Sequence, residues 1–293
     1  MTDITALIAN GPVILDGGWG TQLQRLGLEV GAHPDLWNLT APEKVEQVAR
    51  AYVEAGSRII LTNTFGATKF TLEKHGHGDR VAEVNRSGVE ISKRATSGTQ
   101  TKVFASMGPT GVMLMMGEVA PERLYDAFLE QAAALAAAGA DAIVIETMSD
   151  PAEAELAVKA AKSTGLPVAV SFVFDSGKNN DRTMMGTTPE QMVRQMTDAG
   201  ADIIGSNCGQ GIDGFIPICR RMRAVTAMPI WMKANAGLPE IEDGKAVYRQ
   251  SPEHFAEKAR ELAQAGANFI GGCCGTSPDF VQALANVFPF SRE

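Results

Sequence analysis

Three of the four cysteines stand where the ligands of a metal site are expected. Cys208 lies in "GSNCGQG", and Cys273 and Cys274 lie in "GGCCGTSP", each just past an apolar run. Three thiolates that leave one position open are typical of a catalytic zinc site, because a structural site normally fills its fourth position with a protein ligand. Adjacent residues at a strand end point in opposite directions, so Cys273 and Cys274 reach one ion only where the backbone bends, which the neighbouring glycines permit.

Other arrangements of the thiols and other catalytic groups are less well supported. Four cysteines are too few for a disulfide scaffold, and a vicinal or cytosolic disulfide is rare, so the main alternative is that all three thiols only fill the core. Cys219 lies in a helical stretch and is interpreted as a small buried hydrophobe. His33, His75, His77 and His254 fall at no predicted strand terminus, which argues against a histidine-rich catalytic site.

Two carboxylates are expected near the thiols. Asp16 opens "DGGWGTQLQ", where Gly17 and Gly18 leave backbone amides exposed, so this turn could hold the zwitterionic end of an amino acid with Asp16 facing the ammonium. The alternative is a tight turn with a helix cap. Glu146 ends another apolar run, and the hydroxyls of 62–68 end a third. Glu146 taken alone fits a structural acid equally well.

These residues follow a repeated pattern that predicts a barrel. The phrases are "EAGSRIILTN" at 54–63, "AAGADAIVIE" at 137–146, "DAGADIIGSN" at 198–207 and "QAGANFIGGC" at 264–273. In each, a Gly ends a helix and a strand buried on both faces follows. Further apolar runs lie at 13–16, 102–107, 166–172 and 228–233. Eight such units predict an α/β protein, a single (β/α)8 TIM-type barrel over 1–293 with ligands at the carboxyl ends of its strands, with an open α/β sheet as the alternative.

Composition excludes several classes of function. The net charge is -8 and the basic residues are scattered, which argues against a nucleic-acid partner. The amino-terminal residues do not form an export signal, and no run of about 18 apolar residues is present, so we expect no membrane span and a cytoplasmic location.

With these residues assembled, the chain resembles the homocysteine S-methyltransferase family. The resemblance spans nearly the whole chain through "DGGWGTQLQ", "NTFGAT", "MGPTG", "IETM", "SNCG", "ANAGLP" and "GGCCGTSP". It implies a methyltransferase of the EC 2.1.1 type that uses Zn²⁺ to methylate the thiol of homocysteine, giving methionine. The positions that correspond to the family's sites are Cys208, Cys273 and Cys274 for zinc and Asp16, Gly17, Gly18, Thr64 and Glu146 for the bound amino acid. Asn235 matches a position close to the metal, where its amide oxygen would fill the open zinc site in the absence of substrate.

The resemblance leaves several methyl donors open. The betaine-using branch carries aromatic residues at the second and fourth strand ends, where this chain has Gly66 and Thr147, which disfavours betaine. The motifs "DGGWGTQLQ", "NTF" and "NAGLP" are most similar to the homocysteine-binding module of cobalamin-dependent methionine synthase. This resemblance implies a separate protein that carries a methyl-corrinoid. The alternative is a small donor of the S-methylmethionine or betaine type, with Trp19 and Trp37 as candidates for a cation-binding cage.

Two other functions fit the same residues. The first is a barrel lyase or isomerase in which Glu146 is the general base and the cysteines are structural. The second is a non-catalytic thiol-binding partner of a corrinoid protein. The first would tolerate replacement of Cys274 by Ser, and the second would bind zinc without turnover.

Overall fold

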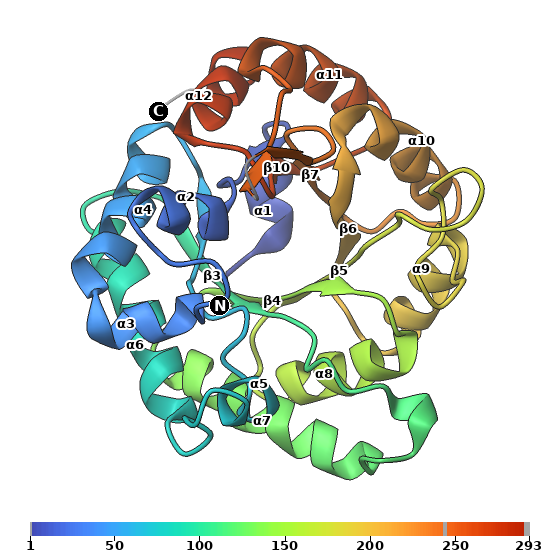
Figure 1. Ribbon diagram of the computed structural model, residues 1–293. Helices are drawn as coiled ribbons and strands as arrows, with labels where there is room; N and C mark the ends of the chain where they lie inside the picture. The colour runs from blue at the N-terminus through green and yellow to red at the C-terminus, as the bar shows by residue number, and fades with distance from the viewer. Residues whose placement is uncertain (1, 243–244, 290–293) are drawn as a thin grey trace.

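Eight parallel strands form the barrel that the sequence predicts. The computed structural model describes residues 2–242 and 245–289. The strands are β1 (Val13–Ile14), β2 (Ile59–Leu61), β3 (Lys102–Met107), β4 (Ala142–Met148), β5 (Val168–Phe172), β6 (Ile203–Gly211), β7 (Ile230–Asn235) and β10 (Phe269–Gly272), in the order β1-β10-β7-β6-β5-β4-β3-β2. The backbone N–H of Arg58 donates to the carbonyl of Ile14 at 2.8 Å and links β2 to β1, so the sheet is a nearly closed ring (Figure 1).

Helices surround this ring, except α1 (Ile4–Ile8), which packs against the residues of its interior (Figure 1). The others are α2 (Trp19–Arg25), α3 (Trp37–Thr40), α4 (Pro42–Glu54), α5 (Lys69–Glu73), α6 (Val81–Ala95), α7 (Pro121–Ala137), α8 (Pro151–Lys162), α9 (Pro189–Asp198), α10 (Ile212–Arg223), α11 (Pro252–Gln264) and α12 (Pro278–Val287), with 3-10 helices η1 (Pro34–Leu36) and η2 (Leu114–Met116). The glycine of each repeated phrase has a positive φ and ends its helix, as at Gly139 (φ 91°) after α7 and Gly266 (φ 108°) after α11. This confirms the helix-then-strand interpretation of the repeat.

Large side chains fill the barrel interior, so the ring is a packed core and not a pore. Trp231 lies against Phe104 with ring centroids 6.0 Å apart and against Phe269 at 5.5 Å. Ile4, Leu7 and Ile8 of α1 pack against the same cluster. Because side chains fill the interior, we expect a ligand to bind outside it, at the end of the barrel where the carboxyl ends of the strands lie.

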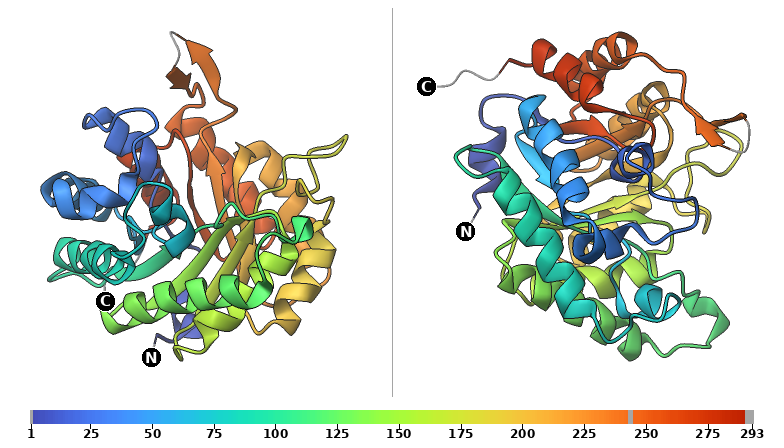
Figure 2. Two further views of the ribbon diagram at one scale, coloured as in Figure 1. Left: turned by 60° about the horizontal axis from the view of Figure 1, so that its bottom comes forward. Right: turned by 60° about the vertical axis from the view of Figure 1, so that its left-hand side comes forward.

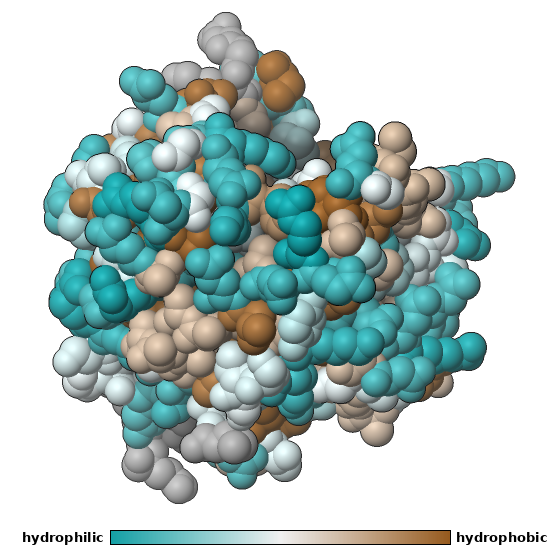
Figure 3. Space-filling model, turned by 90° about the horizontal axis from the view of Figure 1, so that it is seen from below, coloured by the Kyte–Doolittle hydropathy of each residue, from teal (hydrophilic) through white to brown (hydrophobic). Residues whose placement is uncertain are grey.

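The two ends of the barrel differ. A hairpin of β8 (Glu240–Glu242) and β9 (Lys245–Val247) projects at one end, away from the amino terminus, which lies at the other end (Figure 2). The helical face drawn in Figure 3 is largely hydrophilic, with scattered hydrophobic residues. Within 2–242 and 245–289, no helix has both the length and the apolar character needed to cross a membrane.

Gly205 in β6 provides a test of the strand packing. A methyl group at this position would overlap the backbone carbonyl of Trp231 on β7, which cannot move without breaking the sheet. We therefore expect Gly205→Ala to lower the free energy of unfolding by about 3 kcal/mol, measured by chemical denaturation. Gly20→Ala is the matched control, because a Cβ there has nothing within 4 Å and the backbone is already helical, so it should keep or raise the free energy of unfolding, by up to about 1 kcal/mol.

Candidate functional site

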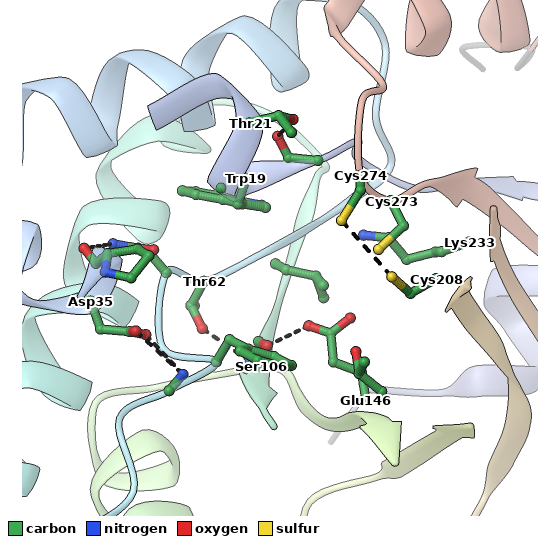
Figure 4. A pocket seen from close by; sticks show the side chains of 18 of the residues that line it. Trp19, Thr21, Asp35, Thr62, Ser106, Glu146, Cys208, Lys233, Cys273 and Cys274 are labelled. Carbon is green, nitrogen blue, oxygen red and sulfur yellow. Dashed lines mark hydrogen bonds between the residues drawn. The ribbon is translucent and has the colours of Figure 1, made fainter. Parts of the chain in front are cut away.

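The three cysteines named from the sequence lie together at the carboxyl end of the barrel. The Sγ atoms of Cys208, Cys273 and Cys274 all lie within 4.8 Å of one another, and those of Cys208 and Cys274 are 3.9 Å apart (Figure 4). A tetrahedral zinc ion with Zn–S bonds of about 2.3 Å requires sulfur atoms about 3.8 Å apart. The observed spacing therefore fits that geometry.

Backbone bends turn these thiols toward one another. Cys208 has a left-handed φ of 61° within an irregular stretch of β6, and Gly275 has a φ of 82° just after the vicinal pair. The N–H of Cys273 donates to the carbonyl of Ala234 at 2.7 Å, and the N–H of Cys274 donates to Oδ1 of Asn235 at 3.0 Å. The turn after β10 is thus fixed against the end of β7, and the bend expected at the vicinal cysteines is present.

The electrostatics of the cluster favour a bound cation. Hydrogen bonds from the thiols of Cys273 and Cys274 lower the pKa of Cys208, and the same contact with Cys208 raises the pKa of Cys273. One thiolate thus forms at the expense of the others, because like charges at this distance repel. All three can ionise together only when a cation shares the site, and soft thiolate ligands select a metal such as zinc.

The thiols lie on the wall of a cavity of about 370 Å³ at the mouth of the barrel. Its walls come from the loops that follow β1, β2 and β10, together with the ends of β3, β4, β6 and β7. The lining residues used below are Gly17, Gly18, Trp19, Thr62, Ser106, Glu146, Thr147, Lys233 and the three cysteines. A thiol that binds at a metal held by the cysteines would therefore lie in a cavity with room for the rest of its molecule.

Asp16 is not free to meet a ligand directly, because three groups of the protein already occupy its carboxylate. Lys233 forms a fully buried ion pair with Oδ1, and Oδ2 accepts hydrogen bonds from Trp19 Nε1 and the N–H of Leu61, both at 2.7 Å. Burial alone would lower the pKa of Lys233, but the carboxylates of Asp16 and Glu146 outweigh it and raise that pKa. Lys233 therefore stays charged on the cavity wall.

Of the two acids predicted from the sequence, Glu146 is the one that lines the cavity and remains available to a ligand. Its Oε1 accepts a hydrogen bond from Ser106 Oγ, and Figure 4 places its carboxyl group between Ser106 and Cys208. Burial raises the pKa of Glu146, and the charge of Lys233 and the Ser106 hydrogen bond oppose that shift. Since Lys233 is already paired with Asp16, Glu146 provides an acidic group that forms no ion pair with any residue of 2–242 and 245–289.

The glycine turn and Thr64 lie differently from what the sequence predicts. Gly17 and Gly18 line the cavity, but the N–H of Gly18 donates to Thr276 Oγ1 at 3.0 Å and is not a bare donor. A Cβ on Gly18 would lie 2.5 Å from the carbonyl oxygen of Cys273, so glycine lets this turn pack on the cysteine loop. Thr64 lies behind the wall, and its hydroxyl donates to the carbonyl of Ser106 at 2.7 Å.

Asn235, predicted as a metal ligand, and Trp37, predicted as part of a cation-binding cage, are not among the residues that line the cavity. The amide oxygen of Asn235 accepts a hydrogen bond from the N–H of Cys274, so the role of Asn235 as a metal ligand stays a prediction. Trp37 does not line the cavity, and Lys44 lies over its ring at 4.7 Å, whereas Trp19 does line it. A cage built from both tryptophans is therefore not present in this structure.

The site also contains residues that the sequence does not predict there. His33 and His75 reach it from loops with their rings 4.7 Å apart, although neither lies at a strand terminus. Lys233 carried a usable signal, because a charged residue near the end of an otherwise apolar run requires a buried partner. Asn207 and Ser106 carried no comparable signal, since short polar residues at strand ends are common.

Known proteins resemble this chain along nearly its whole length. The model of the family described as homocysteine S-methyltransferase matches residues 13–288. Methionine synthase of Mycobacterium leprae is 30% identical over 302 residues, and that of Mycobacterium tuberculosis is 29% identical over 301. Each alignment covers 97% of this chain and 25% of the relative, so the chain spans about a quarter of the length of these relatives.

Solved structures share the fold. The metallated form of the homocysteine methyltransferase MmuM from Escherichia coli superimposes with a TM-score of 0.80 at 22% identity, covering 97% of this chain and 98% of that one. The carboxyl transferase domain of Rhizobium etli pyruvate carboxylase has a TM-score of 0.55 at 10% identity, over 97% of this chain and 47% of that one. At these identities the likeness concerns the barrel alone.

Proposed function

The chain belongs to the homocysteine S-methyltransferase family, and we propose that it transfers a methyl group to the thiol of homocysteine, giving methionine, at a zinc ion held by Cys208, Cys273 and Cys274. The observation that carries this proposal is the group of three thiols, within 4.8 Å of one another, on the wall of the cavity at the mouth of the barrel. A bound zinc ion supplies Lewis acidity that lowers the pKa of a substrate thiol, so that the thiolate is available at neutral pH.

The residues beside the thiols fit the amino-acid end of homocysteine. We assign the α-ammonium group to Glu146, whose carboxylate faces the cavity and has no ion-pair partner in the described part of the chain. The turn at Gly17 and Gly18 carries no side chains and leaves room for the α-carboxylate beside Lys233. The protein thereby fixes the substrate at both ends and orients its sulfur atom toward an incoming methyl group.

Asp16 and Thr64 support this wall without touching the substrate. Asp16 keeps the ammonium of Lys233 charged and in place. Thr64 holds the carbonyl of Ser106, and the hydroxyl of Ser106 in turn donates to Glu146. We infer that both residues act on substrate binding through their neighbours, which refines the direct contact expected from the sequence.

A screen of methyl donors tests the proposed reaction. Zinc-loaded protein is incubated with homocysteine and, in separate reactions, with methylcobalamin, a methylated corrinoid protein, S-methylmethionine, betaine or dimethylsulfoniopropionate. We expect one donor class to support methionine formation well above a protein-free control, and that class identifies the second substrate. If zinc-loaded protein binds homocysteine but forms methionine with none of them, the chain is a thiol-binding protein and the proposed reaction is wrong.

A further inference from the structure

The side chain of Asn207 connects four parts of the barrel directly behind the cavity. Asn207 is fully buried in β6. Its Oδ1 accepts hydrogen bonds from the N–H of Thr147 at 2.7 Å and from Ser171 Oγ at 2.6 Å. Its Nδ2 donates to Thr147 Oγ1 at 2.7 Å and lies 3.9 Å from the Sγ of Cys273. One side chain therefore joins β4, β5, β6 and the cysteine loop after β10.

This pattern uses the whole hydrogen-bonding capacity of an amide. An asparagine side chain has two acceptor lone pairs and two N–H donors, and Asn207 uses all four. The backbone N–H of Thr147 can only donate, so the amide oxygen must face it and the amide N–H must face Cys273. No other side chain of this size supplies two donors and two acceptors in one plane.

Asn207 is linked to two unusual backbone conformations, by hydrogen bonds to Thr147 and by its peptide bond to Cys208. Thr147 has a φ of 65°, and Cys208, the next residue after Asn207, has a φ of 61°. Such left-handed conformations cost a non-glycine residue about 1–3 kcal/mol and persist only where surrounding contacts impose them. The pairing of β4 is irregular between Ile145 and Met148, the stretch that turns Glu146 toward the cavity. The contacts of Asn207 with both Thr147 groups fix that irregular stretch.

We propose that Asn207 is a positioning residue that couples the metal half of the site to the substrate half. On the metal side, its Nδ2–H donates to the sulfur of Cys273. On the substrate side, it holds the stretch that carries Glu146. The substrate half rests on the proposed function, whereas the metal half rests only on the three thiols and their contacts.

The variant Asn207→Asp separates this role from simple packing. Aspartate has nearly the same shape and still accepts hydrogen bonds from Thr147 and Ser171, but it cannot donate to Cys273 and it adds negative charge beside the thiols. We expect its affinity for Zn²⁺ alone, measured on metal-stripped protein by competition with a chromogenic chelator, to fall about 10- to 100-fold. The thiolate-to-metal charge-transfer bands of the Co²⁺-loaded variant should shift, and the KM for homocysteine should rise by about tenfold.

The matched control is Ser171→Ala, which removes one hydrogen bond to Asn207 but leaves those to Thr147 and Cys273. Its zinc affinity should stay within about twofold of the unaltered protein, since the donor to sulfur remains. If Asn207→Asp does not fold, Asn207→Ser replaces it with the same expectation. The proposal is wrong if the folded variant melts at a lower temperature but keeps its zinc affinity, Co²⁺ spectrum and KM. If the unaltered protein binds zinc without forming methionine, the proposed function fails while the zinc comparison remains decisive.

Discussion

Replacing Cys274 by Ser is expected to release the metal and to slow methyl transfer to homocysteine by about 1000-fold or more, because Lewis-acid activation contributes several kcal/mol. A serine hydroxyl has a far higher pKa than a thiol and does not form a comparable anion at neutral pH. The two remaining thiols, Cys208 and Cys273, then form an incomplete ligand set. Zinc content per chain and the rate of methionine formation measure the two effects.

Cys219 provides the matched control for this variant. It is buried in α10, its Sγ lies 4.0 Å from the carbonyl of Leu262, and burial raises its pKa to about 12. Cys219→Ser should therefore keep full zinc content and activity, with at most a small loss of stability. A Cys274→Ser variant as active as the unaltered protein would mean that the cysteines are structural and that the barrel catalyses another class of reaction.

Replacing Glu146 by Gln is expected to lower kcat/KM for homocysteine by about 30- to 1000-fold. Loss of one member of a buried charge pair, here that of Glu146 with the α-ammonium group, costs about 2–4 kcal/mol. Glutamine keeps the shape of the side chain and the hydrogen bond to Ser106, but it removes the charge that faces the α-ammonium group. The measurement compares homocysteine with 4-mercaptobutyrate, which has the same thiol and carboxylate but no amino group.

The comparison of the two substrates separates recognition from chemistry. If Glu146 binds the ammonium, the kcat/KM of Glu146→Gln for 4-mercaptobutyrate should lie within about threefold of that of the unaltered protein. This substrate has no ammonium group, so the charge pair that the variant loses never forms with it. An equal loss for both substrates would contradict this role and would place Glu146 in proton transfer instead, as in the lyase or isomerase alternative. The zinc content should remain unchanged, since Glu146 is not among the metal-binding group.

The fold and the metal group could be predicted from the sequence because both depend on local, repeated signals. Each repeated phrase places a helix-ending glycine a fixed number of residues before a buried strand, and this spacing also places Cys208 and Cys273 at equivalent strand ends. In a parallel barrel all strand ends meet on one rim, so convergence of the thiols follows from topology alone. The structure confirms the eight strands and the convergence of the thiols.

The detailed partners of the acids could not be predicted, because they depend on which residues face one another across the barrel. The sequence predicts that Asp16 meets a ligand, whereas in the structure Lys233, which lies 217 residues later, pairs with its carboxylate. Asn207 contacts Thr147 across 60 residues of sequence. Such contacts are set by strand register and local bends, and a residue's own neighbours in the sequence carry no information about them.

Methylation of homocysteine at a zinc ion held by the three thiols can be tested directly. The most direct test removes the metal with a chelator, restores it with one equivalent of Zn²⁺ per chain, and measures methionine formation at each stage with the donor found in the screen. We predict that activity falls to the protein-free background on removal and returns when zinc is restored. Metal-free protein that still methylates homocysteine at the zinc-loaded rate would contradict the mechanism.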